Sequence, residues 1–148
     1  MTRKNWILIA TLMMLGGGYL YRFTDLLVPP QIQIDVSTRP SGRGAADAMV
    51  LPTLFLLDRE YAVQTLRVIA VSNVPAAQLG KSVWHLAAQG KSEPQRGLVY
   101  GEPLSGYRVV QSPSELIPGG IYRIELLAGR AKGSREFKAI APASAVTE

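Results

Sequence analysis

The sequence predicts an all-β fold: an antiparallel Greek-key sandwich of about seven strands, preceded by one N-terminal transmembrane helix. Beyond residue 30, short runs alternate between apolar and polar residues, and clusters of Gly, Pro and Ser separate them at regular intervals. Before them stands an uncharged apolar run, residues 6–21. The chain of 148 residues contains no cysteine, and a body of roughly 100 residues can bury a core without disulfides.

The N-terminal run is long enough to be read as a membrane anchor. Its 16 to 20 residues would extend roughly 24–30 Å as a helix, which matches the hydrocarbon core of a bilayer. We expect Trp6 at one interface, Tyr19 and Tyr21 at the other, and Arg22 extending outward beside them. These residues define a cytoplasmic stub over 1–4 and a transmembrane anchor with its exit turn over 5–28.

A cleaved export signal is the alternative explanation of the same segment. Residues 6–15 would form its apolar region, and the small residues Gly16 and Gly18 would suit a signal peptidase, although an Ala-x-Ala pattern is missing. Arg3 and Lys4 precede the run and favour a cytoplasmic N-terminus. With the anchor retained, the protein would be a single-pass protein of the cell (inner) membrane. Both explanations place the body outside the cytoplasm, in the periplasm or beyond the cell.

The remainder divides into a short stalk, a sandwich and a tail. Pro29 and Pro30 form an extended stalk, residues 31–140 form the sandwich, and residues 141–148 form a flexible tail. We expect a turn over 58–60, a long loop over 72–82 and a short turn over 129–134. The expected strands cover residues 31–37, 52–58, 63–72, 83–89, 97–100, 107–112, 121–129 and 135–140.

One motif carries a resemblance to known proteins. Leu116, Pro118 and Tyr122 are spaced Leu-x-Pro-x-x-x-Tyr directly before a strand of alternating residues. This spacing resembles the sixth strand of fibronectin type III domains, which commonly have threonine where this chain has Gly120. The resemblance implies a tyrosine corner, in which the hydroxyl of Tyr122 bonds to the backbone a few residues upstream. Immunoglobulin-like sandwiches are the related alternative, although their two bridging cysteines are absent.

The implied topology also predicts an interaction surface. In such a fold, whose strands are lettered A to G, the N-terminus shares one end of the sandwich with the loop between strands B and C and the loop between strands F and G. We take the expected strand over 83–89 as strand C. The second of these loops contains Arg130 and Lys132, with Arg135 just after it, and Lys81 ends the first. We expect these four side chains to contact anionic lipid headgroups or an acidic partner beside the membrane.

The residue composition gives no support to several classes of function. Sixteen basic and eleven acidic residues give a net charge of +5, too small and too dispersed for a nucleic-acid binder. His85 is the only histidine, so we predict no metal site, no cofactor and no small-molecule ligand. A catalytic unit of His85 with Ser82 or Ser105 and Asp58 has no supporting motif, and we predict that the protein is not an enzyme. Catalysis would require a pocket that contains His85.

We therefore predict a protein-binding module displayed at the membrane. Its partners would be the lipid bilayer and a protein in or at the membrane, with the chain acting as an accessory or structural subunit of a membrane complex. A carbohydrate-binding or cell-wall-binding module is the alternative. That alternative needs exposed aromatic side chains on one face, for which the candidates are Trp84, Tyr100 and Tyr107.

Overall fold

The computed structural model describes residues 3–23, 28–38 and 50–141. The chain forms two compact units, Met1–Pro30 and Gln31–Glu148. Three predicted features lie partly outside the described residues: the start of the cytoplasmic stub, residues 24–27 of the anchor and its exit turn, and nearly all of the C-terminal tail.

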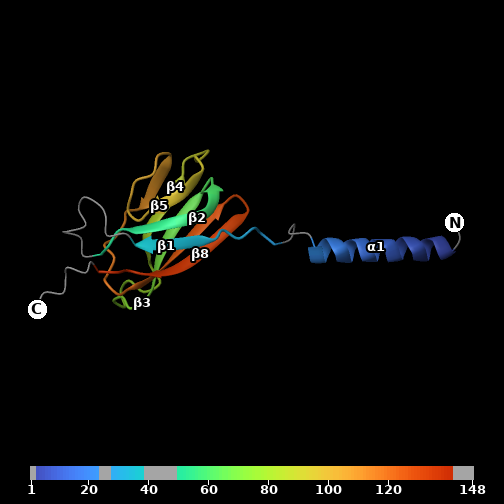
Figure 1. The fold of residues 1–148 in the computed structure, drawn as a ribbon, viewed down its shortest axis with the longest axis horizontal. Helices are drawn as coiled ribbons and strands as arrows, with labels where there is room; N and C mark the ends of the chain where they lie inside the picture. Colours follow the sequence, from blue (N-terminus) through green and yellow to red (C-terminus); the bar gives the residue numbers. More distant parts are fainter. Residues whose placement is uncertain (1–2, 24–27, 39–49, 142–148) are drawn as a thin grey trace, which may run out of the picture. The chain divides into compact units, whose positions relative to one another are not determined.

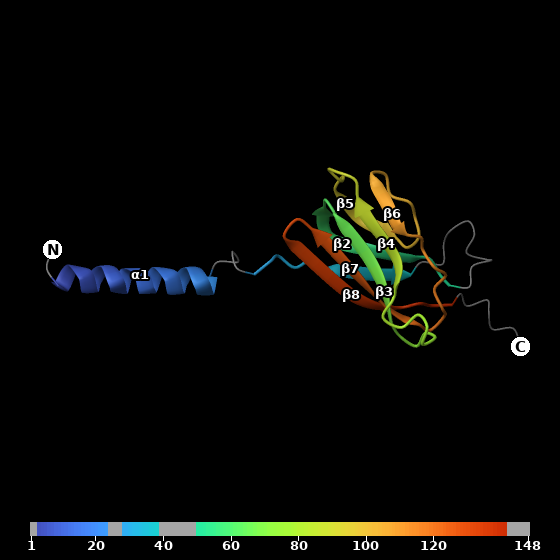
Figure 2. The same ribbon diagram turned by 180° about the vertical axis from the view of Figure 1, so that it is seen from behind.

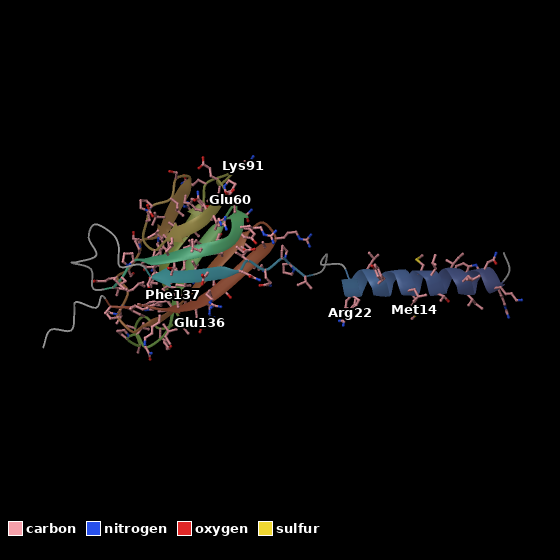
Figure 3. The ribbon with its side chains drawn as sticks, in the orientation of Figure 1. Met14, Arg22, Glu60, Lys91, Glu136 and Phe137 are labelled. Atoms are coloured by element: carbon pink, nitrogen blue, oxygen red, sulfur yellow. The ribbon has the colours of Figure 1, made fainter. Side chains whose placement is uncertain are left out.

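The first unit contains one helix, α1 (Arg3–Phe23). The helix forms where an apolar segment was predicted, and its apolar side chains are exposed, as Met14 illustrates at 83% (Figure 3). Nevertheless, no helix among the described residues is both long and apolar enough to cross a membrane. This finding corrects the prediction of a transmembrane span over 5–28. The helix has sufficient length, but the glycines at 16–18 add little apolar surface and polar residues occupy both ends.

The second unit contains eight strands within the described residues, and each overlaps one of the eight expected ranges. In chain order they are β1 (Ile34–Thr38), β2 (Thr53–Tyr61), β3 (Thr65–Ser72), β4 (Ser82–Ala88), β5 (Gln95–Val99), β6 (Tyr107–Gln111), β7 (Ile121–Ala128) and β8 (Ala131–Lys138).

These strands form a two-layer antiparallel sandwich, which confirms the predicted fold class for the body. One sheet has the order β1-β2-β5, and the other has the order β6-β4-β3-β7-β8. All pairings between these strands are antiparallel. The opposite views of Figures 1 and 2 show the two sheets stacked against each other, with β1 and β2 in one layer and β3, β7 and β8 in the other.

The chain enters the sandwich at the edge of the five-stranded sheet and then changes sheets. Gln31 forms a parallel bridge with Lys132 of β8, and the amide of Ile32 donates to the carbonyl of Lys132 at 2.7 Å. Two residues later, β1 pairs with β2 of the other sheet. The crossing depends on Gly133, because a Cβ atom there would lie 2.6 Å from the carbonyl oxygen of Ile32.

Alternating residues from both sheets fill the space between the layers. Tyr122, Ile124 and Leu126 of β7 are buried, whereas the residues between them are only partly covered. Phe55 of β2 packs edge-on against Phe137 of β8, with ring centroids 5.1 Å apart, and this contact joins the two sheets. Trp84 of β4 is 1% exposed and packs edge-on against Tyr100 at 5.2 Å.

The predicted tyrosine corner has a clear counterpart in the structure. The amide of Ile117 donates to the hydroxyl of Tyr122 at 2.9 Å, while Leu116 is buried and Pro118 is exposed. Gly120 is required next to this contact, since a Cβ atom there would lie 2.8 Å from the ring of Tyr122. This crowding explains why the chain has glycine at a position where the resembling domains commonly have threonine.

Two segments differ from the sequence-based expectation. Residues 58–60 were predicted to be a turn, yet they lie within β2, where their exposed side chains extend the strand beyond its buried half. The loop over 72–82 was predicted to be the loop between strands B and C of the sandwich. It joins β3 to β4, which are neighbours in one sheet. The charged residues 58–60 resemble a turn in the sequence, whereas the second error concerned which strands pair, since the boundaries of β3 and β4 were predicted to within two residues.

Candidate functional site

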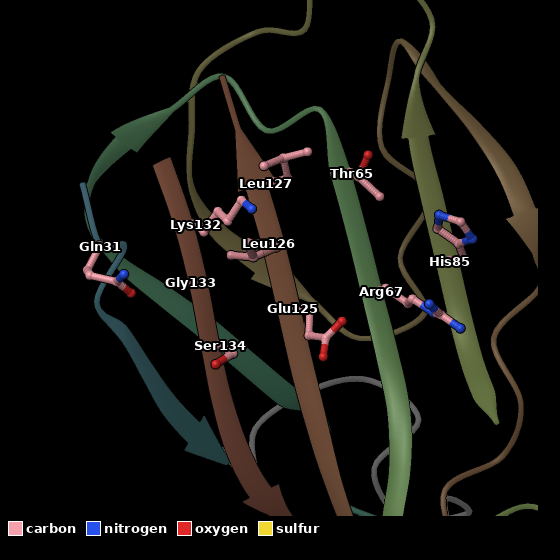
Figure 4. A pocket seen from close by; sticks show the side chains of 10 residues that line it. All are labelled: Gln31, Thr65, Arg67, His85, Glu125, Leu126, Leu127, Lys132, Gly133 and Ser134. Atoms are coloured by element: carbon pink, nitrogen blue, oxygen red, sulfur yellow. The ribbon is translucent and has the colours of Figure 1, made fainter. Parts of the chain in front are cut away.

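The outer face of the five-stranded sheet contains a depression of about 490 Å³. Figure 4 shows its side chains projecting from β3, β4, β7 and β8. Its apolar part comes from Leu126 and Leu127. The polar and small residues that complete the lining are Gln31, Thr65, Arg67, His85, Glu125, Lys132, Gly133 and Ser134.

Strand register places four of these polar residues in one row across the sheet, and Gln111 outside the depression extends that row. Arg67 of β3 lies opposite Glu125 of β7 on one side and opposite His85 of β4 on the other. Ser134 of β8 continues the row beyond Glu125, and Gln111 of β6 continues it beyond His85. Because directly opposite side chains on one face of a sheet are close enough to interact, the row forms one continuous polar surface.

A second row lies beside the first, two residues along β8, β7, β3 and β4 and three residues along β6, where the register with β4 shifts between His85 and Leu86. It consists of Lys132, Leu127, Thr65, Ala87 and Arg108, in order from β8 to β6. Together the two rows carry three cationic side chains, Arg67, Arg108 and Lys132, and only one carboxylate, Glu125. The depression therefore lies in a part of the sheet with a local excess of positive charge.

His85 is partly buried and lies next to Arg67, the central residue of the first row. Burial lowers the pKa of His85 below its ordinary value of 6.5, and the nearby positive charge of Arg67 lowers it further. The imidazole is consequently neutral at pH 7, with one nitrogen able to donate and the other able to accept a hydrogen bond. In Figure 4 the side chain of Arg67 extends toward β4, the strand that carries His85.

Arg67 has no ion-pair partner in the part of the chain that the structure describes. The ion pairs within 3–23, 28–38 and 50–141 join Arg59 to Asp58 and Arg123 to Glu136. Arg67 is an exposed residue that lines the depression. It can therefore bind a carboxylate or phosphate from a partner with both of its outward nitrogens.

Three of the four residues predicted as an interaction surface lie on the β7–β8 hairpin. Arg130 is in its turn, Lys132 lines the depression, and Arg135 is further along β8. The chain enters the sandwich at the same end, since Ile32 bonds to Lys132. Lys81 is separate from them, because the β3–β4 loop follows Ser72, and Ser72 pairs with Ile121 at the other end of β7. The predicted four-residue surface is thus divided between two ends of the sandwich.

Arg135 borders a second depression, of about 610 Å³, where the chain crosses between the sheets. Asp35 and Asp58 also line it, so positive and negative charges face the same space. Asp58 already accepts hydrogen bonds from the amide of Gln33 at 3.3 Å and from the hydroxyl of Tyr61 at 3.2 Å. These contacts hold the strand crossing in place and assign Asp58 a structural role away from His85.

The aromatic residues required by the carbohydrate-binding alternative are not arranged as an exposed platform. Trp84 is buried in the core. Tyr100 donates its hydroxyl hydrogen to the carbonyl of Ser114 at 2.6 Å, and Tyr107 donates to the carbonyl of Val63 at 2.6 Å. All three side chains therefore contribute to packing or to holding loops.

The residues predicted to position a membrane anchor lie along α1. Trp6 is 67% exposed near its start, while Tyr19 and Tyr21 are 64% and 77% exposed near its end. Arg22 projects from the last turn (Figure 3). Within the described residues, the helix that carries them is not long and apolar enough to cross a membrane.

His85 meets the first condition set for catalysis, because it lines a pocket, but the other predicted members of a catalytic unit are elsewhere. Asp58 is on the other sheet, and the hydroxyl of Ser82 donates to the carbonyl of Trp84 at 3.2 Å. No group of three or more His, Asp or Glu residues suited to a metal ion occurs in the part of the chain covered by the structure. The geometry around His85 is suited to binding through charge and hydrogen bonds.

The sequence did not single out Arg67, Glu125 or Ser134, which together with His85 make up most of the central row. Alternation along each strand placed all of these side chains outside the core. Alternation does not determine which residues of neighbouring strands are opposite, because that depends on register and on bulges such as the one between Val68 and Ile69.

Comparison with known proteins gives no family assignment. The chain matches no protein-family model, and it has no significant match among curated proteins. Among solved structures it is similar to the sulfur carrier protein SoxY from Chlorobium limicola f. thiosulfatophilum. That similarity has a TM-score of 0.37 at 10% sequence identity, over 86% of this chain and 90% of the other. We base no functional argument on a similarity of this size.

Proposed function

We propose that the protein is a membrane-associated β-sandwich that works by binding another protein outside the cytoplasm. The observation that supports this most strongly is the contrast in burial between the two units. The sandwich buries most of its large apolar residues in its own core, whereas α1 exposes most of its own, from Trp6 to Tyr21. Exposed apolar surface of this extent needs a lipid or protein environment.

The proposed role of α1 is to direct the chain to the membrane and keep it there. Arg3 and Lys4 precede the uncharged segment, which is the charge pattern of an export signal. Trp6, Tyr19 and Tyr21 have the amphipathic rings that favour the headgroup region. Association through these side chains requires no membrane span. On this proposal the sandwich lies in the periplasm or on the outer surface.

The proposed role of the sandwich is to hold a partner protein. Its outer face offers a depression, a neutral histidine and unpaired cationic groups, and these features support recognition. At the family level, the tyrosine corner and the two-sheet arrangement support a relationship to fibronectin type III or immunoglobulin-like domains. Domains with this architecture mostly act by binding, and this inference is an analogy between folds.

The test is purification of the tagged full-length chain from membranes in a mild detergent, with identification of proteins that accompany it in fixed proportion. We expect a stoichiometric partner and an intact mass that includes α1. Recovery of the chain alone would contradict the role as an accessory subunit. A mass that begins after residues 16–18 would instead show a cleaved leader and would remove the membrane-retention part of the proposal.

A further inference from the structure

The outer face of the five-stranded sheet combines features that together favour an acidic ligand. The two adjacent rows supply three cations against one carboxylate, and two of those cations, Arg67 and Lys132, line a depression of about 490 Å³. Neither Arg67 nor Lys132 forms an ion pair within the described residues. Outward-facing cations with no partner on their own sheet are available to a second molecule.

The arrangement also favours carboxylates in particular. Arg67 has a planar guanidinium that can bind a carboxylate with two parallel hydrogen bonds. His85 lies directly opposite Arg67 and can add a third bond from its ring N–H. Strands in a sheet are about 4.8 Å apart, so the row from Ser134 to Gln111 extends roughly 19 Å. An extended peptide of about six residues covers that length.

We infer that Arg67 and His85 form a carboxylate-binding site on the outer face of the sandwich, and that the site holds Asp or Glu side chains of an extended, acidic segment of a partner protein. Lys132 and Arg108 flank this site and attract further acidic residues of the same segment. Glu125 restricts the site on the β7 side, because it repels a carboxylate that approaches there. The inference rests on the proposed protein-binding function and specifies the chemistry of its partner.

The single histidine of the chain provides a direct probe of this site. We suggest recording the imidazole NMR signals of His85 in the full-length protein, purified in detergent through a tag that lacks histidine. The probe ligand is acetylated, amidated hexaglutamate, and hexaglutamine of the same length is its control. His85 lies opposite Arg67 of β3 and opposite Gln111 of β6. Arg108 of β6 is opposite Ala87, two residues along β4 from His85, and Glu125 of β7 is one strand beyond Arg67.

The expected result is a saturable shift of the His85 signals with hexaglutamate and none with hexaglutamine. The pKa of His85 should rise when the peptide is bound, because added carboxylates stabilise the imidazolium. Arg67→Gln should weaken the binding about tenfold, the loss expected for one charge-assisted contact. Arg96→Gln is the matched control. It removes one exposed cation from β5 of the other sheet and should change binding less than about twofold.

Several outcomes would overturn the inference. One is the absence of a His85 response to hexaglutamate in the wild-type protein. Equal urea midpoints of wild type and Arg67→Gln would show that both proteins are folded in this comparison. Equal weakening by Arg67→Gln and Arg96→Gln would show a general charge effect without a site. An Arg67-dependent response to phosphatidylglycerol vesicles in place of hexaglutamate would show that the face takes lipid headgroups. If a partner copurifies and Arg67→Gln retains it, the proposed function stands and this inference fails.

Discussion

The inner and outer faces of the five-stranded sheet are built from the same alternating strands, but their side chains differ in burial. On the inner face, Trp84, Leu86, Val68 and Ile124 are nearly fully buried and contribute to the core. On the outer face, His85 and Arg67 occupy the positions between them and remain accessible. Substitutions on the inner face should therefore change the free energy of unfolding, whereas those on the outer face should change binding with little effect on folding.

The largest effect is expected from the inner face at Trp84. Trp84→Ala removes a side chain that is 1% exposed and contacts the ring of Tyr100. We expect the free energy of unfolding to fall by about 3–5 kcal/mol, as is usual when a large buried aromatic residue is truncated. Urea denaturation followed by circular dichroism measures this change. A loss below about 1 kcal/mol would show that Trp84 is not central to the core.

A smaller loss is expected where the chain crosses from one sheet to the other. Gly133→Ala places a Cβ atom 2.6 Å from the carbonyl oxygen of Ile32, so backbone must shift, at a cost of about 1–3 kcal/mol. Gly97→Ala in β5 is the matched control, because its Cβ atom would lie 3.8 Å from Leu56, an ordinary contact. Urea denaturation of both variants should show a loss only at Gly133. Similar values for the two would mean that the crossing is not tightly packed.

The tyrosine corner should contribute less than either of these. Tyr122→Phe retains the buried ring but removes the acceptor for the amide of Ile117. We expect a loss of about 1–2 kcal/mol, because a hydrogen bond is lost and a partly buried amide has no replacement partner. Thermal melting of the variant beside wild type gives the value. An unchanged midpoint would indicate that water satisfies the amide equally well.

The smallest effect concerns the outer face and depends on pH. The pKa of His85 is lower in the folded protein than its ordinary value of 6.5, so the unfolded chain binds a proton more readily. As the pH falls through 6.5 toward the folded-state pKa, wild type should therefore lose stability relative to His85→Gln. Urea midpoints of both proteins between pH 5 and 8 test the difference. A wild type that gains stability relative to the variant on acidification would reverse the assigned sign.

The fold class followed from local features of the sequence, because alternation and turn residues report which face of a strand is buried. The run from Ile121 to Ala128 shows this directly, with alternate residues inside the core. The same reasoning missed the extension of β2 through Asp58, Arg59 and Glu60, since three successive exposed residues at the end of a strand resemble a turn. The apolar run also predicted the helix over residues 3–23 correctly. The prediction that this helix crosses a membrane was wrong.

The candidate site was only partly predictable, because it depends on contacts between strands distant in the sequence. His85 was noted as the only histidine and Lys132 as part of a basic hairpin. Arg67 and Glu125 became relevant only when the register placed them opposite each other. Lys81 was grouped with that hairpin because the loop containing it was assigned to a different pair of strands. Sequence alternation does not contain this information on pairing.

The most direct test of the account compares partner binding by the two charge variants. Full-length wild type, Arg67→Gln and Arg96→Gln would be isolated from membranes in mild detergent, and the amount of each accompanying protein would be measured per copy of the chain. We expect one partner to be retained by wild type and Arg96→Gln and reduced about tenfold by Arg67→Gln. Equal retention by all three proteins would contradict the assignment of the outer face as the binding surface.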